Sequence, residues 1–127
     1  MSDVVATVKT VDALLTAYQS GERNFVNVML PQSGLSGVDL KGADLSYADF
    51  SGADLSQANL RGSDLSYATL CEANLTGADL RGAMLLGTDL RESVLDKALL
   101  QSADYDPEET HFPSGFDPEA AEMKCDR

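Results

Sequence analysis

The sequence has little of the chemistry that enzymes use. Among 127 residues it contains no tryptophan, two cysteines and one histidine. His111 stands beside Phe112 and Pro113, without the neighbours that a His-rich metal site or a catalytic triad would need. Neither cysteine has a partner at metal-ligand spacing, and no glycine-rich phosphate-binding loop leads into a helix. These absences predict a protein that is not an enzyme and has no cofactor, metal site or catalytic residue.

Basic residues are also few. Nine lysines and arginines stand against 21 aspartates and glutamates, which gives a formal net charge of −12 at pH 7. Residues 1–24 carry −1, residues 25–105 carry −6 and residues 106–127 carry −5, so the C-terminal tail is disproportionately acidic. This balance argues against direct binding to nucleic acid or to anionic membranes, and it favours either simple solubility or a basic partner.

Long apolar runs are missing as well. Met1 to Ala6 lack the basic start and the sustained apolar stretch of a secretory signal. No apolar run of transmembrane length follows them. We therefore expect a cytoplasmic protein that does not associate with membranes.

What the sequence does contain is a five-residue repeat. From Phe25 to Tyr105 every fifth residue is Leu, Phe or Tyr, over seventeen positions without a slip. From Val28 to Ala103, the residue two places before each central residue is small or β-branched. A period of five fits neither the 3.6 of a helix nor the 2 of a strand. One repeat buries too little apolar surface to fold alone, so the pattern predicts a solenoid of stacked repeats.

Many of these blocks share the motif Ala-Asp/Asn-Leu-Ser/Arg-Gly, as in residues 38–42 (VDLKG), 43–47 (ADLSY) and 78–82 (ADLRG). In this motif the sequence resembles the pentapeptide-repeat family. The resemblance implies an all-β solenoid, a right-handed quadrilateral β-helix of about four coils, in which each block forms one side of a square. Such a fold implies no single function. The core positions implied by the resemblance are Leu40, Leu45, Phe50, Leu55, Leu60, Leu65, Leu70, Leu75, Leu80, Leu85, Leu90 and Leu95.

The repeat divides the chain into an N-terminal cap and lead-in at residues 1–24, the β-helix at 25–105 and an acidic tail at 106–127. Before the repeats, Thr10 is a suitable N-cap for a helix that Gly21 would end. Because the open end of a solenoid needs a cover, we expect this helix to cap the first coil, and a partner-binding helix is the alternative. Its apolar face consists of Val11, Leu14, Leu15 and Tyr18.

The last repeats are apolar at outward positions that earlier repeats fill with Asp or Ser: Met84, Leu86, Val94 and Leu99. Apolar groups at such positions favour a cover. The tail offers Phe112, Phe116 and Met123, and its Asp-Pro pairs at 106–107 and 117–118 can start short helical turns. We expect the tail to form a lid over the four apolar residues, and a docking patch for another protein is the alternative.

Folding the sequence by twenty residues aligns rows of side chains. Lys41, Arg61 and Arg81 fall in one row, flanked by a row of Asp39, Asn59 and Asp79. One interpretation is a recognition stripe, and the other is a solvated face on which neighbouring acids offset like charges. The aspartate rows offer too few converging oxygens for calcium. The candidate interaction surface is Lys41, Arg61, Arg81, Tyr47, Tyr67, Met84 and Leu86.

The two cysteines leave a disulfide possible. Cys71 follows a central Leu, a position that points outward in the fold that the resemblance implies, while Cys125 lies in a tail that could fold back. Free thiols are expected if the protein is cytoplasmic.

We therefore expect a non-catalytic interaction or scaffold module that is monomeric and has an unidentified protein partner. The alternative is a DNA mimic that binds a type II topoisomerase, as some members of the resembled family do. About four coils would span only roughly 19 Å, and the charge of the repeats is lower than that of duplex DNA of that length. A sensor function would depend on the cysteines or the aspartate rows alone. Residues 18–25 and 110–118 are similar to the flanks of cyanobacterial family members, which suggests a cyanobacterial source.

Overall fold

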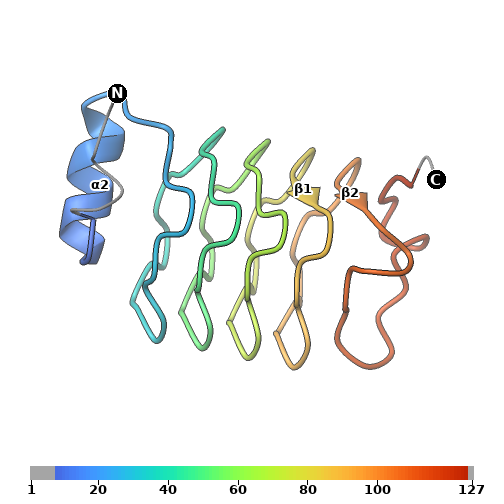
Figure 1. The fold of residues 1–127 in the computed structure, drawn as a ribbon. Coiled ribbons are helices and arrows are strands. Elements are labelled where there is room, and N and C mark those ends of the chain that lie inside the picture. Colours follow the sequence, from blue (N-terminus) through green and yellow to red (C-terminus); the bar gives the residue numbers. More distant parts are fainter. Residues whose placement is uncertain (1–7, 126–127) are drawn as a thin grey trace.

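The computed structural model describes residues 8–125, so the expectation about a signal at Met1 to Ala6 lies outside the described residues. The chain winds into a stack of similar coils, with helix α2 (Val11–Gln19) at one end and the tail at the other (Figure 1). Between residues 8 and 125, no helix is both long and apolar enough to cross a membrane.

Successive coils are joined by parallel bridges between residues twenty positions apart. The first four are Asn24 to Asp44, Met29 to Asp49, Gly34 to Asp54, and Asp39 to Asn59. The same spacing continues to strands β1 (Met84–Leu85) and β2 (Asp104–Tyr105), which pair in parallel. Four bridges in every twenty residues give each coil four sides, as the resemblance to the pentapeptide-repeat family implies.

We number the four sides by their central residues. Side 1 contains Leu45, Leu65 and Leu85, side 2 contains Phe50, Leu70 and Leu90, side 3 contains Leu55, Leu75 and Leu95, and side 4 contains Leu60, Leu80 and Leu100. The backbone pairing is the same from coil to coil. For example, the Leu40 N–H donates to the Asn59 carbonyl (2.9 Å), and the Asn59 N–H donates to the Val38 carbonyl (2.8 Å).

Each side ends in a tight turn that the repeat encodes. The Ala43 N–H donates to the Leu40 carbonyl (3.1 Å), and Gly42 between them has a φ of 72°. A type II turn requires such a positive φ at its third residue. Asp44 Oδ1 then accepts the N–H of Ser46 (3.1 Å), an amide that the coil-to-coil pairing does not use. Where an Asp or Asn precedes the central residue, its side chain therefore serves the turn, as also seen for Asp39, Asp54 and Asn74.

The central residues form one continuous apolar core. Leu40, Leu45, Phe50, Leu55, Leu60, Leu65, Leu70, Leu75, Leu80, Leu85 and Leu90 are all fully buried. Leu95 is only half-buried, so its place in the predicted core needs correction. The Leu75 N–H donates to the Val94 carbonyl (2.8 Å), but no described residue accepts the corresponding bond from Leu95. Side 3 of the last coil is therefore left uncovered by backbone pairing.

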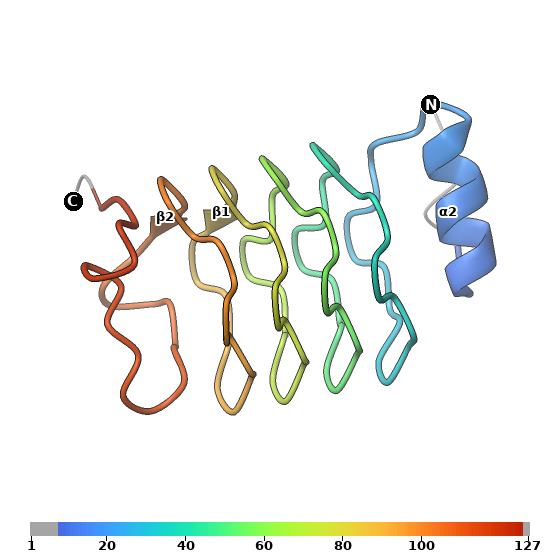
Figure 2. The ribbon, with the colours of Figure 1, turned by 180° about the vertical axis from the view of Figure 1, so that it is seen from behind.

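Helix α2 begins and ends where the sequence predicts. Thr10 is its N-cap, with Oγ1 accepting the N–H of Ala13 (3.1 Å), and Gly21 follows the last turn at a φ of 101°. The helix lies against the first coil (Figure 2), with Leu14 fully buried. The Tyr18 hydroxyl donates to the Lys41 carbonyl (2.6 Å), a backbone group at the edge of that coil.

The tail lies across the opposite end of the core. It pairs with side 2 through the bridge from Asp89 to His111 and with side 1 through the bridge from Asp104 to Lys124. Met123 is buried there. The Asp-Pro pairs at 106–107 and 117–118 begin hydrogen-bonded turns, as predicted, but neither turn extends into a helix.

We expected the tail to form a lid over four outward-facing apolar residues, and this prediction was wrong about what the tail covers. Met84, Val94 and Leu99 are 40%, 43% and 39% exposed, and Leu86 is half-buried. These side chains project outward from the sides of the solenoid, whereas the tail crosses its end. The tail therefore covers the last core residues and leaves the outward residues accessible.

Candidate interaction surface

The structure divides the predicted interaction residues between two sides of the solenoid. Lys41, Arg61 and Arg81 lie on side 4, immediately after its central residues. Met84 and Leu86 lie on side 1, and Tyr47 and Tyr67 lie at the corner between sides 1 and 2. The predicted set therefore forms two separate surfaces.

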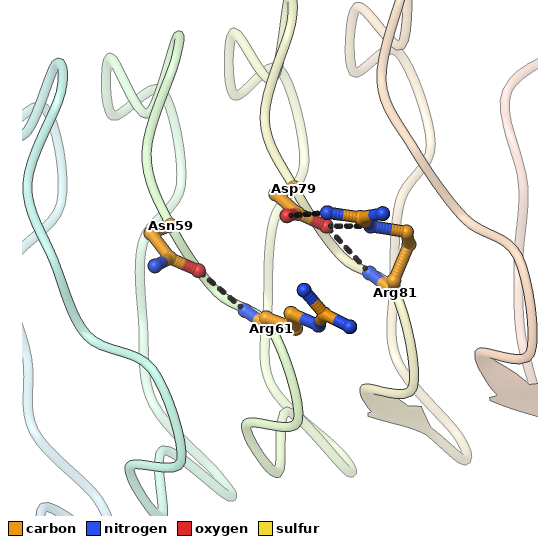
Figure 3. A network of polar contacts seen from close by, with 4 residues as sticks. All are labelled: Asn59, Arg61, Asp79 and Arg81. Carbon is orange, nitrogen blue, oxygen red and sulfur yellow. Dashed lines mark hydrogen bonds and ion pairs between the residues drawn. The ribbon is translucent and has the colours of Figure 1, made fainter.

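The positive charge of the row formed by Lys41, Arg61 and Arg81 is partly neutralised by a neighbouring acid, Asp79 (Figure 3). Arg81 makes a two-pronged ion pair with Asp79, with Nε to Oδ1 at 2.9 Å and Nη2 to Oδ2 at 2.8 Å. The hydrogen bond from Arg81 holds the pKa of Asp79 below its ordinary value. Arg61 differs, because Asn59 replaces the acid and its Oδ1 accepts only the backbone N–H of Arg61 (3.1 Å). Side 4 is thus a surface of mixed charge.

The tyrosine pair forms an exposed aromatic surface. The rings of Tyr47 and Tyr67 stack with centroids 5.3 Å apart, and the two residues are 57% and 47% exposed. The Tyr67 hydroxyl donates to Glu109 Oε1 in the tail (3.2 Å). The negative charge of Glu109 raises the pKa of Tyr67. Leu86 is the backbone neighbour of this pair, because its carbonyl accepts the Tyr67 N–H (2.8 Å). The aromatic and aliphatic residues therefore adjoin.

Gly87 supports this tyrosine pair. A Cβ at position 87 would collide with Cε1 of Tyr67, while Gly62, at the same φ of 67°, has open space around it. We expect Gly62→Ala to cost about 1 kcal/mol through its left-handed backbone, and Gly87→Ala to cost about 1 kcal/mol more through displacement of the ring. Urea unfolding of the two variants measures the difference, and equal costs would mean that Tyr67 does not rest on Gly87.

Ser66 has the only buried side-chain oxygen or nitrogen without a hydrogen-bond partner within residues 8–125. One coil earlier in the same row, Ser46 Oγ donates to Asp44 Oδ1 (2.7 Å). We expect Ser66→Ala to stabilise the fold by a few tenths to about 1 kcal/mol, and Ser46→Ala to destabilise it by about 1 kcal/mol. Thermal unfolding of both variants checks the opposite signs. Destabilisation by Ser66→Ala would show that its hydroxyl is satisfied in solution.

A second acid–arginine pair was not anticipated from the sequence. Arg91 Nε and Nη2 donate to Asp89 Oδ1 and Oδ2, at 2.9 and 2.6 Å. The pKa of Asp89 is strongly lowered, first by the bond from Arg91. The signal was present, since residues 79–81 and 89–91 share the tripeptide Asp-Leu-Arg.

Cys71 and Cys125 are not joined by a disulfide, so the possible bridge between them does not form. Cys71 lies beside Asp89 on side 2, whereas Cys125 lies next to Lys124 at the end of side 1. Burial, followed by the hydrogen bond to Asp89, raises the pKa of the Cys71 thiol. Cys71 is therefore protonated at neutral pH and is a weak nucleophile.

An open hollow of about 430 Å³ adjoins Tyr67. The ring of Tyr67, the Asp89 and Arg91 pair, and Glu108 and Glu109 of the tail line it, together with His111. No set of three or more His, Cys, Asp or Glu side chains in residues 8–125 is placed to hold a metal ion. What the arrangement offers is an aromatic wall with carboxylates around it.

The tail is held at this hollow by one buried hydroxyl, which sequence reasoning also missed. Thr110 Oγ1 donates to the Leu85 carbonyl (2.6 Å) and accepts the N–H groups of Gly87 (3.2 Å) and Asp106 (3.0 Å). Thr110 has no special signal in the sequence, because it stands outside the five-residue repeat. Its three bonds fix the position of Glu108 and Glu109.

A family model matches the part of the chain in which parallel bridges join successive coils. The model for pentapeptide repeats matches in eight copies, over residues 24–62, 33–70, 58–96 and 73–104. A comparison with curated proteins found no match.

Solved structures show the same likeness. The crystal structure of alr5209, a pentapeptide repeat protein from Nostoc, is 48% identical, with a TM-score of 0.90 over 91% of this chain and 95% of that one. A pentapeptide repeat protein of the Arabidopsis thaliana thylakoid lumen is 38% identical over 64% of this chain and 53% of its own, with a TM-score of 0.49. The likeness to the Nostoc protein agrees with the expected cyanobacterial source. With its four-sided coils and its repeat matched from residue 24 to residue 104, the chain belongs to the pentapeptide-repeat family.

Proposed function

We propose that this protein is a non-catalytic protein-interaction module. It is a right-handed rod of about four coils, capped by helix α2 and by the tail, that presents side 1 to another protein. The observation that carries this proposal is the exposed stack of Tyr47 and Tyr67, with the exposed Met84 and the half-buried Leu86 on the same side. Large aromatic and methionine side chains are enriched at protein interfaces. Here they stand on a backbone that is hydrogen-bonded from coil to coil, so little entropy is lost on docking.

Site-specific photocrosslinking tests the proposal. A photoreactive phenylalanine analogue replaces Tyr47 in one variant and Gln57 in the other, because Gln57 occupies the equivalent corner position after side 3 and has a similar positive φ. In the native lysate we expect a discrete protein adduct from position 47 and none from position 57. The same adducts from both positions, or none from either, would count against side 1 as an interface.

The DNA-mimic alternative receives less support from the surface. Side 4 carries Lys41, Arg61 and Arg81, so the negative charge does not surround the rod as phosphates surround duplex DNA. A DNA gyrase supercoiling assay separates the two proposals. Inhibition at low micromolar protein would favour mimicry over a plain interaction module.

A further inference from the structure

The charges are distributed unequally around the solenoid. Over residues 43–102, sides 1 and 2 carry six acids and one base, whereas sides 3 and 4 carry three acids and three bases. The net charge is therefore −5 on the first pair of sides and 0 on the second. The charged residues of sides 1 and 2 are Asp44, Asp49, Asp64, Glu72, Asp89, Glu92 and Arg91, and those of sides 3 and 4 are Asp54, Asp79, Asp96, Arg61, Arg81 and Lys97.

The tyrosine stack stands in the middle of the acidic half. It occupies the corner between sides 1 and 2, with Asp64 on side 1 and Asp49 on side 2. The single base of this half, Arg91, is paired with Asp89 and offsets that one carboxylate, so the other five acids have no basic residue on sides 1 and 2 to balance them. The exposed aromatic surface in this half therefore lies in a predominantly negative field, with Arg91 as its one basic residue.

The hollow beside Tyr67 adds depth to this surface. Its volume of about 430 Å³ accommodates a long side chain, with the Tyr67 ring as one wall. Glu108 and Glu109 bring two further carboxylates to its rim, and neither carboxylate forms an ion pair with any residue between 8 and 125. The raised pKa of Tyr67, caused first by the charge of Glu109, is consistent with a negative potential at this wall.

We propose that the corner formed by Tyr47 and Tyr67, together with this hollow, is the docking surface for an arginine-rich basic segment of a partner protein. This inference depends on the proposed function, since it names the chemistry of the partner that side 1 receives. Arginine combines an apolar stem, which packs along a ring, with a planar guanidinium, which binds carboxylates in two-pronged geometry. A nucleic acid or an acidic partner would be repelled by the same carboxylates.

The test uses the full-length protein and a fluorescein-labelled oligoarginine peptide at physiological ionic strength. Fluorescence anisotropy gives the affinity, and ¹H–¹³C NMR of the tyrosine rings gives the location without any substitution. We expect the ring signals of Tyr47 and Tyr67 to shift on titration, while those of Tyr18 at the opposite end do not. An oligolysine peptide should bind less tightly, because an ammonium lacks the planar fork of guanidinium.

Two double variants with the same change in net charge supply the matched control. Glu108→Gln with Glu109→Gln removes two charges from the rim of the hollow beside Tyr67, and Asp54→Asn with Asp96→Asn removes two from side 3. We expect the first pair to weaken peptide binding by about tenfold and the second by less than about twofold. Tyr47→Ser, which changes no charge, should also weaken binding. Circular dichroism confirms that each variant is folded.

Equal weakening by both double variants, or unchanged tyrosine signals, would overturn the docking site and leave only diffuse attraction to an acidic protein. The proposed function fails separately. If crosslinking from position 47 captures a partner whose contact segment is not basic, the interaction module stands and this inference falls. If crosslinking from position 47 captures nothing, the proposed function itself falls.

Discussion

Deleting residues 106–127 is expected to make the protein self-associate and to lower its melting temperature by roughly 10 °C. The deletion removes Met123 from the core. It also removes the carbonyls of His111 and Lys124, which accept the N–H groups of Leu90 (2.7 Å) and Tyr105 (3.1 Å). The last coil would then expose apolar end surface and unpaired strand edges on all four sides, which favours pairing with another copy. The earlier coils keep their own bridges and should persist.

The full-length variant Thr110→Val is the control for this deletion. It removes the three hydrogen bonds of the Thr110 hydroxyl but keeps the apolar cover of the tail. We expect it to lose about 2 kcal/mol of stability and to remain monomeric. Light scattering and differential scanning calorimetry compare the two proteins. A truncated chain that stays monomeric and melts like the full-length protein would show that the tail covers nothing of consequence.

The coils were predictable because one rule repeats along the sequence. Each block carries its own inward residue and a corner residue, and most blocks also carry an Asp or Asn for the turn, so local and global signals agree. Helix α2 was predictable for a similar reason, since Thr10 and Gly21 mark its two ends. The likeness in structure to the Nostoc protein agrees with the family that this rule indicates.

The tail was not predictable, because the rule stops at Tyr105. Its path depends on the Thr110 hydroxyl and on the pairing of His111 with a residue 22 positions earlier, Asp89, instead of the regular 20. No periodic signal encodes that offset. The partial exposure of Leu95 follows from the same irregularity. The tail bridges to sides 1 and 2 and accepts the Ser102 N–H of side 4 at the Glu122 carbonyl (2.9 Å), but no described residue of the tail pairs with the Leu95 backbone on side 3.

The division of the candidate interaction residues between two sides of the solenoid follows from the coil geometry, whereas we predicted them from the sequence as one set. Folding by twenty places Tyr47 beside Tyr67, and the structure stacks their rings. Folding the sequence by twenty also separates the acidic sides 1 and 2 from sides 3 and 4, whose acids and bases balance. What it does not provide is the contact between Tyr67 and Glu109, since the two residues are 42 positions apart and only the tail's path joins them.

The second large effect concerns the core. Leu65→Ala is expected to destabilise the protein by about 3 kcal/mol or more, because Leu65 is fully buried between Leu45 and Leu85 in the column of side 1. In a stack of repeats each coil is stabilised mainly by its contacts with the next, so a cavity in a middle coil weakens the interfaces on both of its sides. Urea unfolding, followed by circular dichroism, measures the loss.

Leu95→Ala is the matched substitution, with the same atoms removed from the same position of the repeat. Because Leu95 is half-buried and no described residue bridges to its side from the tail, we expect a cost of only about 1 kcal/mol. The difference of about 2 kcal/mol between the two variants tests whether the last coil is less tightly covered than the middle ones. Equal costs would mean that the tail closes over side 3 in solution, and the exposure of Leu95 would then need another explanation.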